Sequence, residues 1–255
     1  MIEQPSDKAL RARVRLLGNL LGEVLHEQEG GQVFDAVETL RRGFIRLREG
    51  DDARLRERLM KMIDQLSPNS LTHVVRAFNV YFSLVNIAEQ GYQNRERRRD
   101  VSRGERLWVG SFDDTLRQFQ EQGIGPEQLQ ELFAQTLYLP VFTAHPTESK
   151  RRSIMEALRR IYVVSEQLDA SRLNREQRAE VINELKTQIQ MLWKTDEVRA
   201  HRPRVVDEIR YGLFYFRESL FDAIPAVYRN LEKSMRRVYG DAFEGRDLAL
   251  PTMLR

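Results

Sequence analysis

A helical period in the apolar residues constrains this fold more than any other feature of the sequence. Between residues 7 and 28 an apolar side chain recurs at every third or fourth position: Leu10, Val14, Leu17, Leu21 and Leu25. This spacing places them on one face of an amphipathic α-helix. The same period predicts further helices over residues 32–48, 55–66, 72–97, 112–122, 126–134, 147–169, 175–195 and 206–239. We therefore expect a predominantly α-helical chain.

Residues 137–143 (LYLPVFT) predict a β-strand instead. They form a short apolar run with aromatic and β-branched members, although Pro140 is awkward in a central strand because it has no N–H to donate. No other segment is a convincing partner for this strand within the chain. We therefore expect one or two short strands at most, with an unpaired edge that is a liability for aggregation. Pro225 should kink the last predicted helix.

Charge and composition narrow the class of protein. The 255 residues carry a net charge of only +3, so bulk attraction to nucleic acid should be weak. There is no cysteine, which excludes disulfides and thiol chemistry. The first ten residues contain no apolar signal-peptide core, and the longest apolar-rich run, FNVYFSLVNIA, is too short to span a bilayer. We expect a cytoplasmic protein without a membrane or nucleic-acid partner. Its chain should divide into an N-terminal helical region, 1–110, and a second region, 111–255.

The candidate site lies where the predicted strand gives way to a helix. His145 follows the strand, and Thr147 can cap the helix that begins there. The first amides of that helix carry partial positive charge, which disfavours a protonated imidazole and attracts phosphate or carboxylate. Lys150, Arg151 and Arg152 add cations within the next two turns. Together these residues predict a proton acceptor, His145, beside a site for an anionic substrate.

Structural interpretations of the same residues remain open. Glu148 and Arg152 have the spacing of an ion pair on one helix, and a lone histidine at a strand end is usually structural. The acidic pairs 196–197 and 207–208 resemble metal ligands, but adjacent helical positions point apart, so helix capping and ion pairs are the better interpretation. The aromatic run 211–216 (YGLFYF) predicts core packing. No metal ligand is assigned.

Three ordered motifs resemble one family. VFTAHPTESKRRS, at 141–153, closely resembles the histidine signature of phosphoenolpyruvate carboxylases, and AFNVYFSLVNIAEQ, at 77–90, is similar to their helix with an N-x-AEQ element. The segment 192–229 is similar to their pattern of W-x-TDE-[IV]-R, P-x-x-x-DE and an aromatic stretch, with Phe221 where tryptophan is commoner. The resemblance covers most of the chain from about residue 71 onward.

The resemblance implies a fold and a reaction. The family fold is an α/β barrel embedded in many helices. The family's enzymes, expected to be homotetramers, use Mg2+ or Mn2+ to form oxaloacetate and phosphate from phosphoenolpyruvate and bicarbonate, through carboxyphosphate and the enolate of pyruvate. The product is anaplerotic for the tricarboxylic acid cycle. His145 would accept the proton of carboxyphosphate, and Arg151 and Arg152 would help to order the phosphate-facing loop.

The chain also departs from the family. Family members are several times longer, and their GGDRDGNP block, FHGRGG-type loop, acidic metal ligands and catalytic lysine have no match here. Our leading hypothesis is an N-terminal portion of a phosphoenolpyruvate carboxylase, inactive in isolation. The alternatives are a natural short paralogue that acts as a helical protein-interaction module and, more weakly, nucleic-acid binding through the arginines at 95–99 and 202–204.

Overall fold

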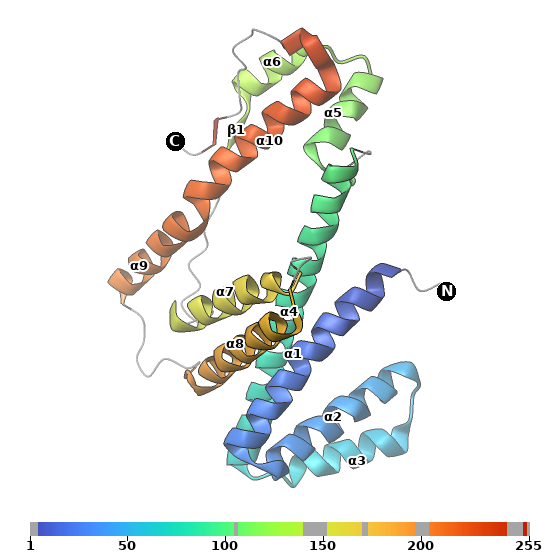
Figure 1. Cartoon of the computed structure of the whole chain (residues 1–255), viewed down its shortest axis with the longest axis vertical. Coiled ribbons are helices and arrows are strands. Elements are labelled where there is room, and N and C mark those ends of the chain that lie inside the picture. The colour runs from blue at the N-terminus through green and yellow to red at the C-terminus, as the bar shows by residue number, and fades with distance from the viewer. Residues whose placement is uncertain are drawn as a thin grey trace. The chain divides into compact units, whose positions relative to one another are not determined.

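The computed structural model describes residues 5–104, 107–139, 152–169, 173–196, 204–243 and 252–253. Helices dominate this part of the chain, as the period of the apolar residues predicts (Figure 1). In chain order the elements are α1 (Pro5–Glu29), α2 (Gly31–Glu49), α3 (Ala53–Asp64), α4 (Pro68–Arg103), α5 (Phe112–Glu121), α6 (Pro126–Gln135), β1 (Leu137–Tyr138), α7 (Arg152–Gln167), α8 (Arg175–Lys194), α9 (Val205–Tyr215), η1 (Phe216–Leu220), α10 (Phe221–Tyr239), η2 (Gly240–Phe243) and β2 (Thr252–Met253). The predominantly α fold class with two short strands is confirmed. None of the described helices is long and apolar enough to cross a membrane.

The chain folds into two compact units, each built from two separate stretches of sequence. Unit 1 comprises residues 1–94 and 150–199, and unit 2 comprises residues 95–149 and 200–255. The two units alternate along the sequence, whereas each of the predicted regions, 1–110 and 111–255, is one continuous stretch. The division of the chain at residue 110 stays a prediction.

Unit 1 is a helical assembly around one apolar core. Helix α8 packs against α1 and α7, and α1 packs against α2. The inward faces of α1 and α8 supply the fully buried Leu17, Val24, Leu185 and Ile189, and α7 adds Ile161. These residues follow the predicted helical period, so the burial of one face on each helix accounts for the arrangement.

Unit 2 is centred on the packing of α5 against α10. Their contact buries Leu116 from α5 and Leu231, Met235 and Val238 from α10, together with Leu129 from α6. Polar bonds reinforce this core at its margin, where Gln120 Nε2 donates to the Val238 carbonyl over 3.0 Å.

The predicted strand has a partner within the chain, contrary to our expectation. Leu137 and Tyr138 pair in parallel with Thr252 and Met253. The prediction of an unpartnered strand was wrong because β2 is only two residues long and carries no recognisable strand pattern. The described part of the predicted strand is also short, and residues 140–143 lie outside the described residues.

The long helix predicted over 206–239 is interrupted by a π-helical turn. In η1, the Phe221 amide donates to the Phe216 carbonyl, five residues back, between α9 and α10. Pro225 lies inside α10, and the kink expected there stays a prediction. The interpretation of the aromatic run as core packing was wrong for α9, because no described side chain of α9 is buried and Leu213 is 51% exposed.

Candidate functional site

Only one of the three predicted site residues lies in the part of the chain that the structure describes. His145 and Arg151 fall in residues 140–151, outside the described residues. Arg152 is the first residue of α7, with its side chain 73% exposed, and its Nε donates to Glu156 Oε1 over 2.7 Å. The Arg152 side chain is therefore exposed to solvent, and it forms an ion pair with Glu156, one turn further along the same helix.

Both ends of the candidate segment 140–151 adjoin anchored elements. Before it, β1 is held by its parallel pairing with β2 in unit 2. After it, α7 is held in unit 1 by Ile154 and Ile161, both buried in the core. The described elements on either side of residues 140–151 are thus each packed within their own unit.

The third motif that resembles the family, residues 192–229, begins in unit 1 beside a cluster of polar side chains. This cluster was not predicted from the sequence. Trp193 Nε1, near the end of α8, donates to Glu29 Oε1 over 2.8 Å. Arg76 from α4 lies over the Trp193 ring, with 4.9 Å from its guanidinium carbon to the ring centroid, and its Nη2 donates to the Thr195 carbonyl over 2.6 Å. His73 Nε2 lies 3.4 Å from Glu29 Oε2. The cluster fixes the end of α8, from which the TDE segment continues.

Asp207, the first acid of the pair 207–208, caps α9, as predicted, whereas Glu197 of the pair 196–197 lies outside the described residues. Asp207 Oδ2 accepts from the Arg204 amide over 3.0 Å at the start of α9. This backbone hydrogen bond is the largest cause that lowers the pKa of Asp207, and the nearby Arg204 and Arg210 guanidinium groups lower it further. Among the residues with described positions, no group of three or more histidine, aspartate and glutamate side chains could hold a metal ion.

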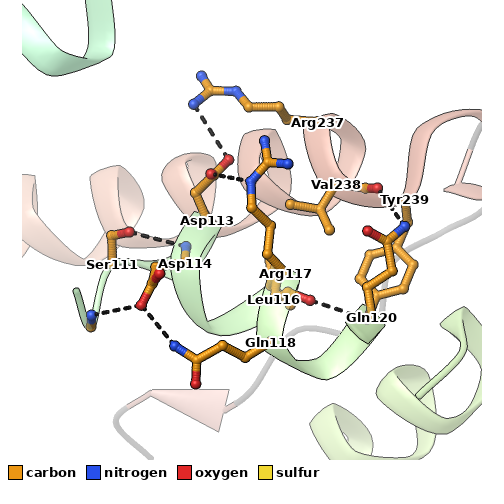
Figure 2. A network of polar contacts seen from close by, with 11 residues as sticks. Ser111, Asp113, Asp114, Leu116, Arg117, Gln118, Gln120, Arg237, Val238 and Tyr239 are labelled. Atoms are coloured by element: carbon orange, nitrogen blue, oxygen red, sulfur yellow. Dashed lines mark hydrogen bonds and ion pairs between the residues drawn. The ribbon is translucent and has the colours of Figure 1, made fainter. Parts of the chain in front are cut away.

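A buried carboxylate lies between two arginines in unit 2. Asp113, on the first turn of α5, has a fully buried side chain. Its Oδ2 accepts from Arg117 Nε over 2.8 Å, and its Oδ1 lies 3.5 Å from Arg237 Nη1 of α10 (Figure 2). Next to it, Ser111 caps α5, because its Oγ accepts from the Asp114 amide over 3.1 Å. The network ties α5 to α10, a structural role that accounts for the burial of this acid.

Comparisons with known proteins agree with the motif resemblance. A family model described as phosphoenolpyruvate carboxylase matches residues 10–250, which include all three motifs. Proteins named phosphoenolpyruvate carboxylase are similar to this chain in several bacteria. The relative from Ralstonia nicotianae is 37% identical over 233 residues, covering 91% of this chain and 24% of the relative. The one from Roseiflexus castenholzii is 39% identical over 236 residues, covering 90% and 24%.

The extent of the match is the decisive point. The similarity runs through nearly all of this chain, although the chain spans only about a quarter of the length of these relatives. A match of this extent is not the chance recurrence of one short motif. The chain belongs to the phosphoenolpyruvate carboxylase family.

Proposed function

We propose that this chain forms an N-terminal part of a phosphoenolpyruvate carboxylase and supplies the histidine of its active site. The observation that carries the proposal is the family match over residues 10–250, which includes the TAHPTE motif around His145. Because the relatives with this name are about four times longer, the activity is proposed for the longer protein. The same extended match favours this assignment over an independent interaction module.

The proposed reaction has three steps. A bicarbonate oxygen attacks the phosphorus of phosphoenolpyruvate, the phosphorus–oxygen bond to the enol breaks, and carboxyphosphate and the enolate of pyruvate result. Carboxyphosphate then loses its proton and separates into CO2 and phosphate. The enolate carbon attacks CO2 and forms oxaloacetate. The relatives' name implies a divalent cation for this chemistry in general, but the described residues offer no set of ligands for one.

His145 is assigned the proton transfer. The sequence predicts that His145 precedes a helix, and a neutral imidazole in that position would be a suitable acceptor for the carboxyphosphate proton, because a helix dipole disfavours the imidazolium form. Arg151 and Arg152 follow His145 by six and seven residues in the sequence and, in this proposal, supply cations toward phosphate oxygens. Arg152 would have to leave its exposed ion pair with Glu156 to do so, which costs little, since exposed ion pairs contribute only about 0–1 kcal/mol.

A chimera tests the assignment. The matched 233 residues of the Ralstonia nicotianae relative are replaced by the corresponding residues of this chain, and oxaloacetate is followed by its reduction to malate with NADH. We expect the chimera to be active and His145→Asn to lower kcat by about 10²–10⁴-fold, the usual contribution of a general base. The 255-residue chain alone should form no oxaloacetate. Unchanged kcat in the His145→Asn chimera would refute the assigned role.

Arg152→Lys in the same chimera tests the role proposed for the arginines, and Glu156→Gln is its control. It keeps the charge and loses the planar, bidentate donor geometry. We expect KM for phosphoenolpyruvate to rise while kcat changes less. Glu156→Gln, which removes the partner that Arg152 has in this structure, should not raise KM.

A further inference from the structure

An arginine of α4 holds the point at which the chain leaves α8. Thr195, the C-cap of α8, has extended backbone angles (φ −89°, ψ 122°), so the chain turns out of the helix at this residue. Its carbonyl accepts from Arg76 Nη2 over 2.6 Å. A cation at this end of a helix also interacts favourably with the partial negative charge of the last carbonyls. We refer to this hydrogen bond, together with the stacking of the Arg76 guanidinium on the Trp193 ring, as the Arg76 clamp.

The Arg76 clamp connects two of the motifs that resemble the family. Arg76 directly precedes the motif 77–90, and Trp193 and Thr195 are the tryptophan and threonine of W-x-TDE in the third motif. The Trp193 ring is 2% exposed, so it is a fixed base for the guanidinium group. Asp196, the first acid of the motif, comes directly after the clamped residue and is exposed. The clamp therefore sets the direction in which this acid leaves the helix.

The end of α8 lies at the same end of a helical hairpin as the candidate segment. Residues 168–174 join α7 to α8, and the two helices pack against each other in opposite directions (Figure 1). A short connection between helices favours such an antiparallel pair. Arg152, which opens α7, and Thr195, which ends α8, therefore lie at the same end of the pair. Residues 140–151, which include His145, adjoin α7 at this end.

We propose that Arg76 is a positioning residue for the carboxylation reaction. By clamping the Thr195 carbonyl, it holds the acidic start of the TDE motif at the end of the hairpin where the segment of His145 joins α7. Asp196 and Arg152 bring opposite charges to this end, so its geometry is sensitive to where the chain leaves α8. Arg76 acts through Thr195 and is not itself assigned a contact with substrate. The inference rests on the proposed function.

Turnover in a chimera tests the role of Arg76. All 255 residues of this chain replace the matched region of the Ralstonia nicotianae relative. Arg76→Met keeps an unbranched side chain beside Trp193 and removes the donor to Thr195. We expect kcat to fall by about 10–100-fold, because misplacement by about 1 Å can cost about 10²-fold in rate. The groups assigned to phosphate are kept, so KM for phosphoenolpyruvate should change less than about threefold. Arg76→Lys keeps the charge and a donor and should recover part of the loss.

Arg13 provides a matched control at the opposite end of the same hairpin. From α1, its Nη1 donates to the Ser165 carbonyl and its Nη2 to Asp169 Oδ1 over 2.7 Å, so it holds the end of α7 as Arg76 holds the end of α8. Arg13→Met and Arg76→Met should both lower the urea midpoint of unit 1, followed by Trp193 fluorescence, but only Arg76→Met should lower kcat. An equal loss of kcat in both variants, or an unchanged kcat in Arg76→Met, would overturn the inference.

Hydrogen exchange in the 255-residue chain tests the clamp without turnover. The Thr195 amide donates to the Leu192 carbonyl over 3.2 Å, so its exchange rate reports opening of the end of α8. Arg76→Met should raise this rate at least about tenfold, because a charged hydrogen bond is lost, whereas Arg13→Met should leave it unchanged. An unchanged rate in Arg76→Met would overturn the inference even if the proposed function holds. A chimera that forms no oxaloacetate before any substitution would contradict the proposed function, and the inference with it.

Discussion

Removal of the buried carboxylate of Asp113 should selectively destabilise unit 2. Its side chain is fully buried, and it accepts from Arg117 Nε over 2.8 Å (Figure 2). A hydrogen bond between charged groups contributes about 1.5–3 kcal/mol. The Arg237 contact, at 3.5 Å, is long, and as a partly exposed ion pair it adds no more than about 1 kcal/mol.

Arg117 and Arg237 limit the loss of stability that follows removal of the Asp113 carboxylate. Removing one partner of a fully buried pair costs about 3–5 kcal/mol, because a buried charge is left uncompensated. Here the Arg117 and Arg237 side chains are 36% and 39% exposed, so water can solvate them once the carboxylate is gone. Asp113→Ala also recovers the cost of burying the acid. We therefore expect a loss of about 2–3 kcal/mol, near or just below the lower end of that range.

The two tryptophans of the chain allow the two units to be followed separately. Trp108 belongs to unit 2 and Trp193 to unit 1, so Trp193→Phe leaves a fluorescence probe in unit 2 alone. In that background Asp113→Ala should lower the urea midpoint of unit 2 by about 1–2 M, for a denaturant slope of about 1.5 kcal/mol per M. Asp222→Ala, which removes an exposed aspartate on α10, is the matched control and should change little. If the urea midpoint of Asp113→Ala equals that of Asp222→Ala, the role of Asp113 in holding α5 against α10 is refuted.

Three further predictions address single contacts. Ser111→Ala removes the cap of α5 and should cost about 1 kcal/mol by the Trp108 probe, whereas Ser111→Thr should restore most of it; equal midpoints for the two variants would contradict the cap. Glu29→Gln weakens the acceptor for Trp193 Nε1 and should cost about 1 kcal/mol in unit 1, read from Trp193 fluorescence with Trp108 replaced; an unchanged midpoint would contradict the bond. The Arg204 amide lowers the pKa of Asp207, so this carboxylate stabilises the start of α9 above its unfolded pKa and ceases to do so as pH falls through its folded pKa. An NMR titration that finds the ordinary aspartate pKa would contradict this.

The helices could be predicted from the sequence because local periodicity and burial agree in most of them. Leu17 and Ile189, for example, follow the 3.6-residue period and are fully buried. The pairing of β1 with β2 could not be predicted, because two residues carry no period and the partners lie more than a hundred positions apart. The aromatic run at 211–216 shows a different limit. The sequence predicts core packing there, but no described side chain of α9 is buried, and a pattern of apolar residues does not specify which other element packs on them.

The candidate site was predictable only as a motif. TAHPTE identifies His145 because residue type and order carry the family signal, and the comparisons confirm the family. The contacts of Trp193 were missed because its partners, Glu29 and Arg76, lie on helices far away in the sequence. Non-local contacts of this kind depend on how helices pack, which no local pattern specifies.

The path of a bicarbonate oxygen shows whether His145 belongs to an enzyme that forms carboxyphosphate. The chimera that carries this chain's residues is supplied with phosphoenolpyruvate and bicarbonate labelled with oxygen-18, and the phosphate released is analysed by mass spectrometry. If His145 serves an enzyme that forms carboxyphosphate, the attacking bicarbonate oxygen stays on phosphorus, so each phosphate carries one labelled oxygen and oxaloacetate accumulates in equal amount. Phosphate without the label would contradict the formation of carboxyphosphate. Oxaloacetate formed equally well after His145→Asn would contradict the role assigned to His145.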